Sequence, residues 1–246
     1  MTPTPVGMRC PECARQRTRV TRGVGEASLL TSAPATFVLI ALNVAAFLAE
    51  VASASGGLGV GASSAVREFG LLGVSVAEGE WYRLLTGGFL HYDFLHILFN
   101  MVALYFLGRI LEPGIGTVRF VFLYFAALFG GAFGALLLSG SDTLTIGASG
   151  AIFGVFGATF VIARARGIDA LAGTVGVLIL INLAISFSTP RISLGGHLGG
   201  LVVGVLCMLV IVAGERGTLG ERRLPAELVA MTAIALVSIA ASLAIA

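Results

Sequence analysis

Long apolar stretches recur along this chain and are separated by short polar segments. Each stretch is close to the ~20 residues that an α-helix needs to cross about 30 Å of hydrocarbon. The pattern therefore predicts an all-α membrane protein with seven transmembrane helices. The expected helices cover residues 34–53, 93–111, 117–138, 147–165, 169–187, 194–213 and 225–246.

Composition supports the same class. The chain has 246 residues, of which 57% are hydrophobic and only 11% are charged, whereas soluble domains carry about 25% charged residues. Too few charges are available to cover a water-exposed surface, so the expected surroundings are a lipid bilayer. The net charge of +2 gives no indication of nucleic-acid binding, and we expect no nucleic-acid partner and no cofactor.

The arginines predict the orientation. Placing the N-terminus in the cytoplasm leaves twelve of the 15 basic residues, all arginine, on the inner side, and only Arg67, Arg83 and Arg191 outside. Inner segments of membrane proteins are enriched in positive charge, so we predict an N-terminus in the cytoplasm of a bacterial plasma membrane. Ala52-Ser53-Ala54 resembles a signal-peptide cleavage site, but the long polar lead and the long first stretch favour a retained helix.

The polar tail, residues 1–33, is rich in arginine and contains Cys10-Pro11-Glu12-Cys13. A CxxC pair is half of a structural zinc site, which needs four ligands. Two interpretations remain open. The pair is a leftover half-site in a flexible tail, or Cys10 and Cys13 form a weak zinc site that another chain or further upstream residues complete.

The segment between the first two expected helices, residues 54–92, begins rich in glycine and serine and ends apolar. Its second half contains Trp81, Tyr82 and Arg83. Amphipathic rings and a snorkelling cation are typical of the membrane–water interface. We therefore expect an ordered, partly embedded loop on the outer side, with a structural role for His91 at its end.

Polar residues open three of the apolar stretches. If the spans are right, the second, fourth and sixth helices all run from outside to inside. His96, Ser149 and His197 then lie in the first turns of these helices, at similar depth below the outer surface. An ionisable side chain at membrane depth is a functional hypothesis by default, although a histidine that only bonds a neighbouring helix is the structural alternative.

Glycine spacing predicts which helices meet. Gly196, Gly200 and Gly204 recur every fourth residue beside His197, and Gly150 and Gly154 do so beside Ser149. Ridges of small residues allow membrane helices to approach closely. Contact between the fourth and sixth helices would bring the serine hydroxyl within reach of the imidazole, unless serine serves there only as one more small packing residue.

Such a pair would have a definite chemistry. Histidine is the usual base that activates a serine nucleophile, and the fourth and sixth helices hold no carboxylate near the site, so we expect a Ser149–His197 dyad. His96 and Asn100 lie four residues apart on one helix face and could complete an oxyanion site with backbone N–H groups at the start of the fourth helix. Phe153, one turn beyond the serine, could pack on the histidine ring.

These residues resemble the rhomboid intramembrane serine proteases over roughly residues 35–213. The serine motif GxSG is matched at Gly147–Gly150, the HxxxN motif at His96 and Asn100, and the glycine-flanked histidine at His197. A Trp-Arg element of the first loop appears as Trp81-Tyr82-Arg83, with a tyrosine inserted. A GxxxExxxG element appears at Gly108, Glu112 and Gly116.

The resemblance implies a rhomboid-like six-helix core plus a C-terminal seventh transmembrane helix. It divides the chain into a cytoplasmic tail (1–33), a protease core (34–213) and a linker with the last helix (214–246). It also implies hydrolysis of peptide bonds in or near the transmembrane segments of single-span membrane proteins. The alternatives are a catalytically silent membrane scaffold of the same fold and a small transporter, which would normally show repeated halves.

Overall fold

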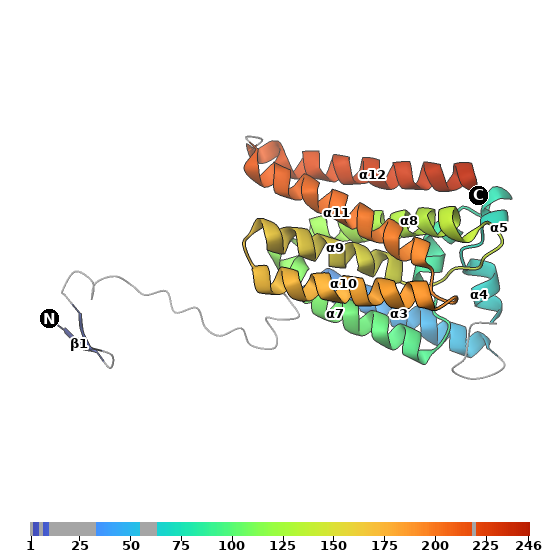
Figure 1. The fold of residues 1–246 in the computed structure, drawn as a ribbon, viewed down its shortest axis with the longest axis horizontal. Coiled ribbons are helices and arrows are strands. Elements are labelled where there is room, and N and C mark those ends of the chain that lie inside the picture. The colour runs from blue at the N-terminus through green and yellow to red at the C-terminus, as the bar shows by residue number, and fades with distance from the viewer. Residues whose placement is uncertain (1, 5–6, 10–32, 55–62, 218–219) are drawn as a thin grey trace. The chain divides into compact units, whose positions relative to one another are not determined.

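The computed structural model describes residues 2–4, 7–9, 33–54, 63–217 and 220–246. The chain divides into two compact units, residues 1–31 and 32–246. The described part of the first unit is an antiparallel pair of strands, β1 (Thr2–Thr4) and β2 (Gly7–Arg9) (Figure 1). Cys10 and Cys13 lie outside the described residues, so a zinc site through this pair stays a prediction.

The second unit is helical, and its long helices confirm the predicted all-α membrane fold. Within the described residues, six helices are long and apolar enough to cross a membrane, and a seventh apolar helix, α9 (Ser149–Ala165), is shorter. The six are α3 (Pro34–Ser53), α7 (Phe94–Ile115), α8 (Thr117–Ser139), α10 (Asp169–Ser188), α11 (Leu194–Arg216) and α12 (Arg223–Ile245), the last preceded by the 3₁₀ turn η2 (Gly220–Arg222).

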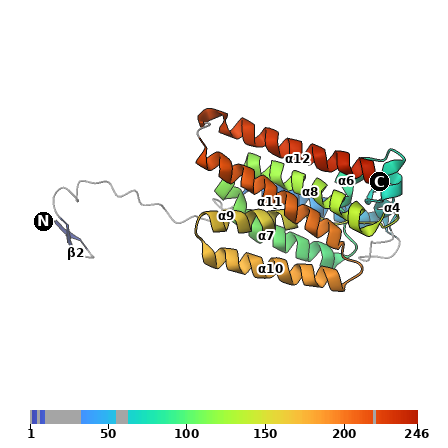
Figure 2. The ribbon, with the colours of Figure 1, turned by 45° about the horizontal axis from the view of Figure 1, so that its top comes forward.

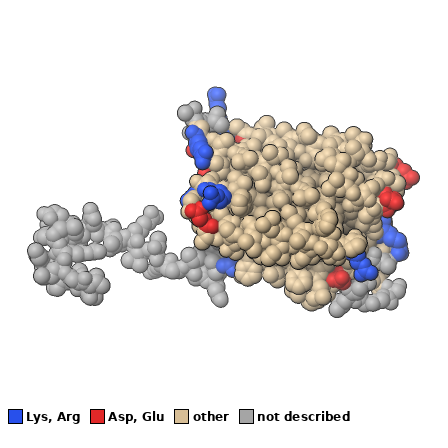
Figure 3. All heavy atoms as spheres, viewed as in Figure 1, with Lys and Arg blue, Asp and Glu red and all other residues tan. Residues whose placement is uncertain are grey.

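The centre of this unit is formed by α8, α9 and α11. Helix α11 packs mainly against α8 and α9, whereas α10 and α12 lie on opposite sides of the bundle (Figure 2). Charged side chains gather at two ends of the face shown in Figure 3, and the band between them is uncharged. This distribution is the one expected of a bundle whose middle is surrounded by hydrocarbon.

Glycines bring the central helices into backbone contact. A Cβ atom placed on Gly200 of α11 would lie 1.9 Å from the carbonyl oxygen of Gly150 in α9. Gly204 and Gly154 repeat this contact one turn further on, at 2.1 Å. The predicted approach of these two helices is therefore present. A third glycine face, on α8, was not predicted: a Cβ on Gly134 would lie 2.2 Å from the Gly195 oxygen.

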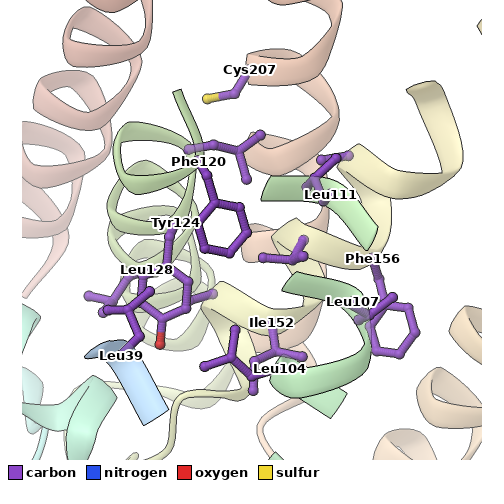
Figure 4. Close-up of a cluster of buried hydrophobic side chains, with 14 of the residues drawn as sticks. Leu39, Leu104, Leu107, Leu111, Phe120, Tyr124, Leu128, Ile152, Phe156 and Cys207 are labelled. Carbon is purple, nitrogen blue, oxygen red and sulfur yellow. The ribbon is translucent and has the colours of Figure 1, made fainter. Parts of the chain in front are cut away.

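A buried apolar cluster fills the space between α7, α8, α9 and α11. Phe120 and Tyr124 of α8 are fully buried, and Leu128 and Leu39 lie near Tyr124, as Figure 4 shows. Cys207 of α11 extends the cluster as a buried free thiol. Close packing across four helices fixes the positions of the helix ends that carry the polar residues.

The segment that precedes α7 is described from residue 63 onward. It contains α4 (Ser64–Phe69), α5 (Gly73–Ala77), α6 (Arg83–Thr86) and the 3₁₀ turn η1 (Gly87–Phe89). It is tied to the loop before α9 by a pair of backbone hydrogen bonds between Leu71 and Thr145, at 3.0 and 2.8 Å. The loop thus forms a cover next to the start of α9.

Arg83 corrects the expectation of a snorkelling cation. Its side chain is buried and donates from Nη1 to the carbonyl oxygens of Arg67 and Gly70, both at 2.8 Å, while Nε pairs with Glu80 at 2.5 Å. A guanidinium offers five donors in a fixed fork, and here they hold the loop together from inside. Trp81, by contrast, is exposed.

Glu112 explains the GxxxExxxG element in structural terms. Its buried carboxylate accepts hydrogen bonds from the N–H groups of Ala35 and Thr36, at 2.9 and 2.8 Å, and from the hydroxyls of Thr36 and Thr117, at 2.7 and 2.8 Å. The first N–H groups of a helix lack intrahelical partners. Glu112 therefore caps α3 and joins it to α7 and α8.

Candidate active site

Three helix starts build the site, because α7, α9 and α11 begin at the same end of the bundle. Asp93 caps α7 by accepting from the N–H of His96 at 2.8 Å. Ser193 caps α11 in the same way through Gly196, at 3.0 Å. Helix α9 begins directly at Ser149, two residues later than the start of the apolar stretch, because Gly147 has a positive φ of 128° that a helix does not accommodate.

Ser149 and His197 lie within hydrogen-bond distance. The serine Oγ is 2.8 Å from Nε2 of the imidazole. The ring of Phe153 stacks on the His197 ring, with 4.1 Å between centroids and 16° between planes. His197 is buried and Ser149 is half-buried. The structure thus brings together the serine and the histidine that the sequence pairs, and the phenylalanine holds the imidazole plane.

The other nitrogen of His197 faces a residue that the sequence analysis did not assign to the site. Nδ1 lies 2.7 Å from the hydroxyl of Ser186, which donates to the carbonyl oxygen of Asn182 at 2.6 Å. Ser186 lies in the last turns of α10, inside the fifth predicted stretch, residues 169–187. Its signal was available, because Asn182 and Ser186 are a polar pair four residues apart in an otherwise apolar run.

His96 contacts the turn that precedes the serine. A Cβ atom on Gly147 would lie 2.9 Å from both Cε1 and Nε2 of His96. The backbone N–H of Tyr92 points at Nδ1 of the same ring, with an N to N distance of 3.4 Å. A neutral imidazole that accepts at Nδ1 carries its proton on Nε2. His96 therefore presents an N–H donor toward the turn that carries Ser149.

Asn100 lies one turn further along α7 and is buried. Its Nδ2 has no hydrogen-bond partner among the described residues. A buried donor without a partner is uncommon and calls for an explanation. Asn100 lines the same cavity as His96, Ser149 and His197, so a substrate oxygen in that cavity is a suitable acceptor.

His91 is placed differently from these residues. It is fully buried, and its backbone N–H donates to the carboxylate of Glu50, at 3.2 and 3.3 Å from the two oxygens. Burial, and to a lesser extent the nearby imidazole of His96, lower the pKa of His91 to about 3. A neutral buried ring on an anchored backbone accords with the structural role expected from the sequence.

A cavity of about 1670 Å³ is lined by Ser149, His197, His96 and Asn100. Its polar part is lined by these four side chains and by the loop around Arg191 and Ser193. Its apolar part continues between α7 and α10, where the lining includes Phe99, Phe106, Leu171 and Leu178. The cleft between these two helices therefore leads from the bilayer side of the bundle to Ser149.

The described part of the chain contains no candidate metal-binding cluster. No group of three or more His, Cys, Asp or Glu side chains in residues 33–54, 63–217 and 220–246 is arranged to hold an ion. The groups nearest the proposed chemistry are instead the hydroxyl of Ser149, the imidazoles of His96 and His197 and the amide of Asn100. That set suits acyl transfer by a nucleophile, a base and neutral hydrogen-bond donors.

Comparison with known proteins agrees with this geometry. A family model described as the Rhomboid domain matches residues 78–214. The chain is 33% identical over 203 residues to Rhomboid protease GluP of Bacillus subtilis, which covers 81% of this chain and 39% of GluP. It is 35% identical over 172 residues to RHOMBOID-like protein 1 of Arabidopsis thaliana, covering 66% of this chain and 43% of that protein.

A third relative, Rhomboid-like protease 1 of Toxoplasma gondii, is 32% identical over 137 residues, or 52% of this chain and 46% of that protein. The chain thus spans less than half the length of each of these three relatives. The family-model match, residues 78–214, includes nearly all residues that line the cavity.

Proposed function

This chain belongs to the rhomboid family, and from that premise we propose that it is an intramembrane serine endopeptidase. The observation that carries the proposal is the 2.8 Å contact between Ser149 Oγ and His197 Nε2 inside a cavity with a polar mouth. The protein is a multi-pass membrane protein with six helices of spanning length in its described residues. Its substrates would accordingly be other membrane proteins.

Ser149 acts as the nucleophile in this proposal. Its Oγ attacks the carbonyl carbon of the scissile bond as His197 Nε2 takes the hydroxyl proton. The tetrahedral intermediate collapses, the C–N bond breaks and His197 returns the proton to the leaving amine. Water then attacks the acyl-enzyme ester, with His197 again as the base, and releases the acid product and free Ser149. Atoms and protons balance over the cycle.

The negative charge that develops on the carbonyl oxygen of the tetrahedral intermediate must be stabilised by hydrogen-bond donors. His96 offers Nε2–H beside Gly147, and Asn100 offers its unpaired Nδ2–H groups. The first N–H groups of α9 add further donors, because they lack intrahelical partners. Losing one donor of this kind typically slows a hydrolase by ~10²–10³.

The cleft between α7 and α10 supports a single-span transmembrane helix as substrate. Its lining from Ile110 and Leu171 up to Ile185 is apolar except for Thr174 and Asn182, and a helix leaving the bilayer would meet largely comparable surroundings along that path. We place the N-terminus in the cytoplasm of a bacterial plasma membrane on the arginine distribution, so the cut would fall near the outer side. A zinc ion at Cys10 and Cys13 remains a separate prediction.

Cleavage of a tagged single-span reporter in liposomes tests the proposal. The wild type should cut the reporter, whereas Ser149→Ala and His197→Ala should not. Ser188→Ala is the matched control, because its hydroxyl bonds only the carbonyl of Ala184, at 2.9 Å, on the exposed side of α10. Activity retained in the Ser149 variant would refute the proposal.

A fluorophosphonate probe distinguishes the rival scaffold function. An assembled dyad should form a covalent adduct at Ser149 whether or not the reporter sequence is a substrate. Labelling without cleavage would mean that the reporter lacks a suitable cleavage sequence. Folded protein that neither cuts nor labels would be a catalytically silent member of the family.

A further inference from the structure

We propose that Ser186 is a positioning residue that fixes the proton of His197 on Nδ1. The inference rests on the proposed function, in which His197 is the base. Ser186 of α10 would set the tautomer and orientation of that histidine, as the aspartate of a catalytic triad does in other serine hydrolases. Nothing in the expected dyad supplied a partner for that side of the ring. The structure places a hydroxyl there, from a helix that contributes neither the nucleophile nor the base.

The direction of each hydrogen bond follows from counting protons. A hydroxyl has one proton to donate and two lone pairs to accept with. Ser186 Oγ lies 2.6 Å from the carbonyl oxygen of Asn182, which can only accept. Its proton is therefore committed to that bond. The 2.7 Å contact with His197 Nδ1 then requires the ring nitrogen to be the donor.

The consequence appears on the opposite side of the ring. An imidazole that carries its proton on Nδ1 has a free lone pair on Nε2. That lone pair faces Ser149 Oγ at 2.8 Å. One chain of hydrogen bonds thus runs from Ser149 through His197 and Ser186 to the backbone of α10. With the opposite tautomer, Nε2 would donate to the serine and could not take its proton.

Burial makes this arrangement specific. Ser186 is 4% exposed and His197 is 7% exposed, so water competes little for either bond. The partner of Nδ1 is neutral, in contrast to the aspartate of a triad. It selects the tautomer and the ring orientation but adds no negative charge to stabilise the imidazolium. Removing a triad aspartate costs about 10⁴ in turnover by leaving the wrong tautomer, and a neutral partner should matter less.

The cleanest measurement is the tautomer itself. The chain has 3 histidines, so ¹⁵N-histidine labelling gives few signals, and those of His197 are identified by their loss in His197→Ala. In the wild type, we expect a protonated Nδ1 and an unprotonated Nε2. In Ser186→Ala, a second population with the proton on Nε2 should appear. A wild-type ring already protonated on Nε2 would overturn the inference without any variant.

Kinetics give the second measurement. For Ser186→Ala, we expect kcat on a cleaved reporter and the fluorophosphonate labelling rate to fall at least roughly 10-fold, with KM unchanged. Ser186→Thr keeps a hydroxyl and should retain most activity. Ser188→Ala removes the same type of bond, to Ala184, two residues further along α10 and away from the site, and should leave both rates unchanged.

The outcomes separate this inference from the proposed function. If the wild type cuts and labels, but Ser186→Ala matches Ser188→Ala in kcat and in its His197 signals, Ser186 has no positioning role and the protease remains. If the wild type neither cuts nor labels, the proposed function fails, while the tautomer measurement still reports whether Ser186 directs the proton.

Discussion

Gly147 and His96 are in contact across the site. A Cβ atom on Gly147 would lie 2.9 Å from Nε2 and Cε1 of His96 and 3.7 Å from Ser149 Oγ. Gly147 also has a φ of 128°, a conformation that L side chains rarely adopt. The turn that presents the serine and the imidazole proposed as an oxyanion donor are therefore positioned against each other.

Gly147→Ala should lower kcat about 100-fold, because a displacement near 1 Å at a catalytic contact is enough for such a loss. Gly79→Ala is the matched control, since Gly79 has a φ of 103° and nothing within 4 Å of a Cβ. Both variants should lose about 1–3 kcal/mol of stability to backbone strain. Reporter cleavage and thermal unfolding of both would test this, and equal losses of activity would contradict it.

Asn100→Ala should separate activity from stability. Because Nδ2 is unpaired in the free protein, its removal should leave the unfolding midpoint unchanged while kcat falls ~10²-fold through loss of an oxyanion donor. Asn43→Ala should behave in the opposite way, since Asn43 is buried and donates to the Leu39 oxygen at 2.8 Å within α3. Cleavage rates and unfolding curves in detergent, measured for both variants, test this prediction. A destabilised but fully active Asn100 variant would exclude a role for Asn100 as an oxyanion donor.

Gly200→Ala should separate α9 from α11. Its Cβ would lie 1.9 Å from the Gly150 oxygen, so the helices must move apart, at a cost of about 1–3 kcal/mol or more. Gly173→Ala in α10 meets nothing within 4 Å and should instead stabilise by about 0.5–1 kcal/mol. Thermal unfolding of both variants, with cleavage of the reporter, measures the effect. A neutral Gly200 variant would show that the helix contact is not tight.

His91 predicts an acid-sensitive stability. Burial holds its pKa at about 3, against an ordinary value of 6.5, so between these values the unfolded chain binds more protons than the folded one. The free energy of unfolding should then be independent of His91 above pH 6.5 and fall as the pH decreases below it. His91→Leu should show a shallower decrease over pH 7–5 in reversible unfolding. Parallel curves for the two proteins would rule out this contribution.

Helix spans were the most predictable part of the fold, because each rests on an apolar run long enough to cross a bilayer. Their ends were less predictable. Helix α7 continues to Ile115, past the Glu112-Pro113 pair at which the apolar run stops. Glu112 can remain inside because four hydrogen bonds from other helices satisfy its carboxylate. Sequence alone does not reveal partners that lie so far away in the chain.

The same limit applies to the candidate site. Glycine ridges and matching depth were sufficient to pair Ser149 with His197, since both signals are local. Ser186 was missed because its role depends on how α10 is rotated about its axis. Arg83 was misread because two of its three partners are the backbone carbonyls of Arg67 and Gly70, which leave no trace in the sequence. The catalytic roles of Ser149, His197, His96 and Asn100 stay predictions until variants are measured.

The short helix α9 has a further consequence. Its 17 residues rise about 25 Å, whereas the 23 residues of α8 and of α11 rise about 35 Å. The start of α9 lines the cavity of about 1670 Å³ between longer helices. Its polar groups can therefore lie below the membrane surface while no unpaired backbone faces lipid. Under the proposed function, the length of α9 would set the depth in the bilayer at which a substrate is cut, at about 1.5 Å per residue.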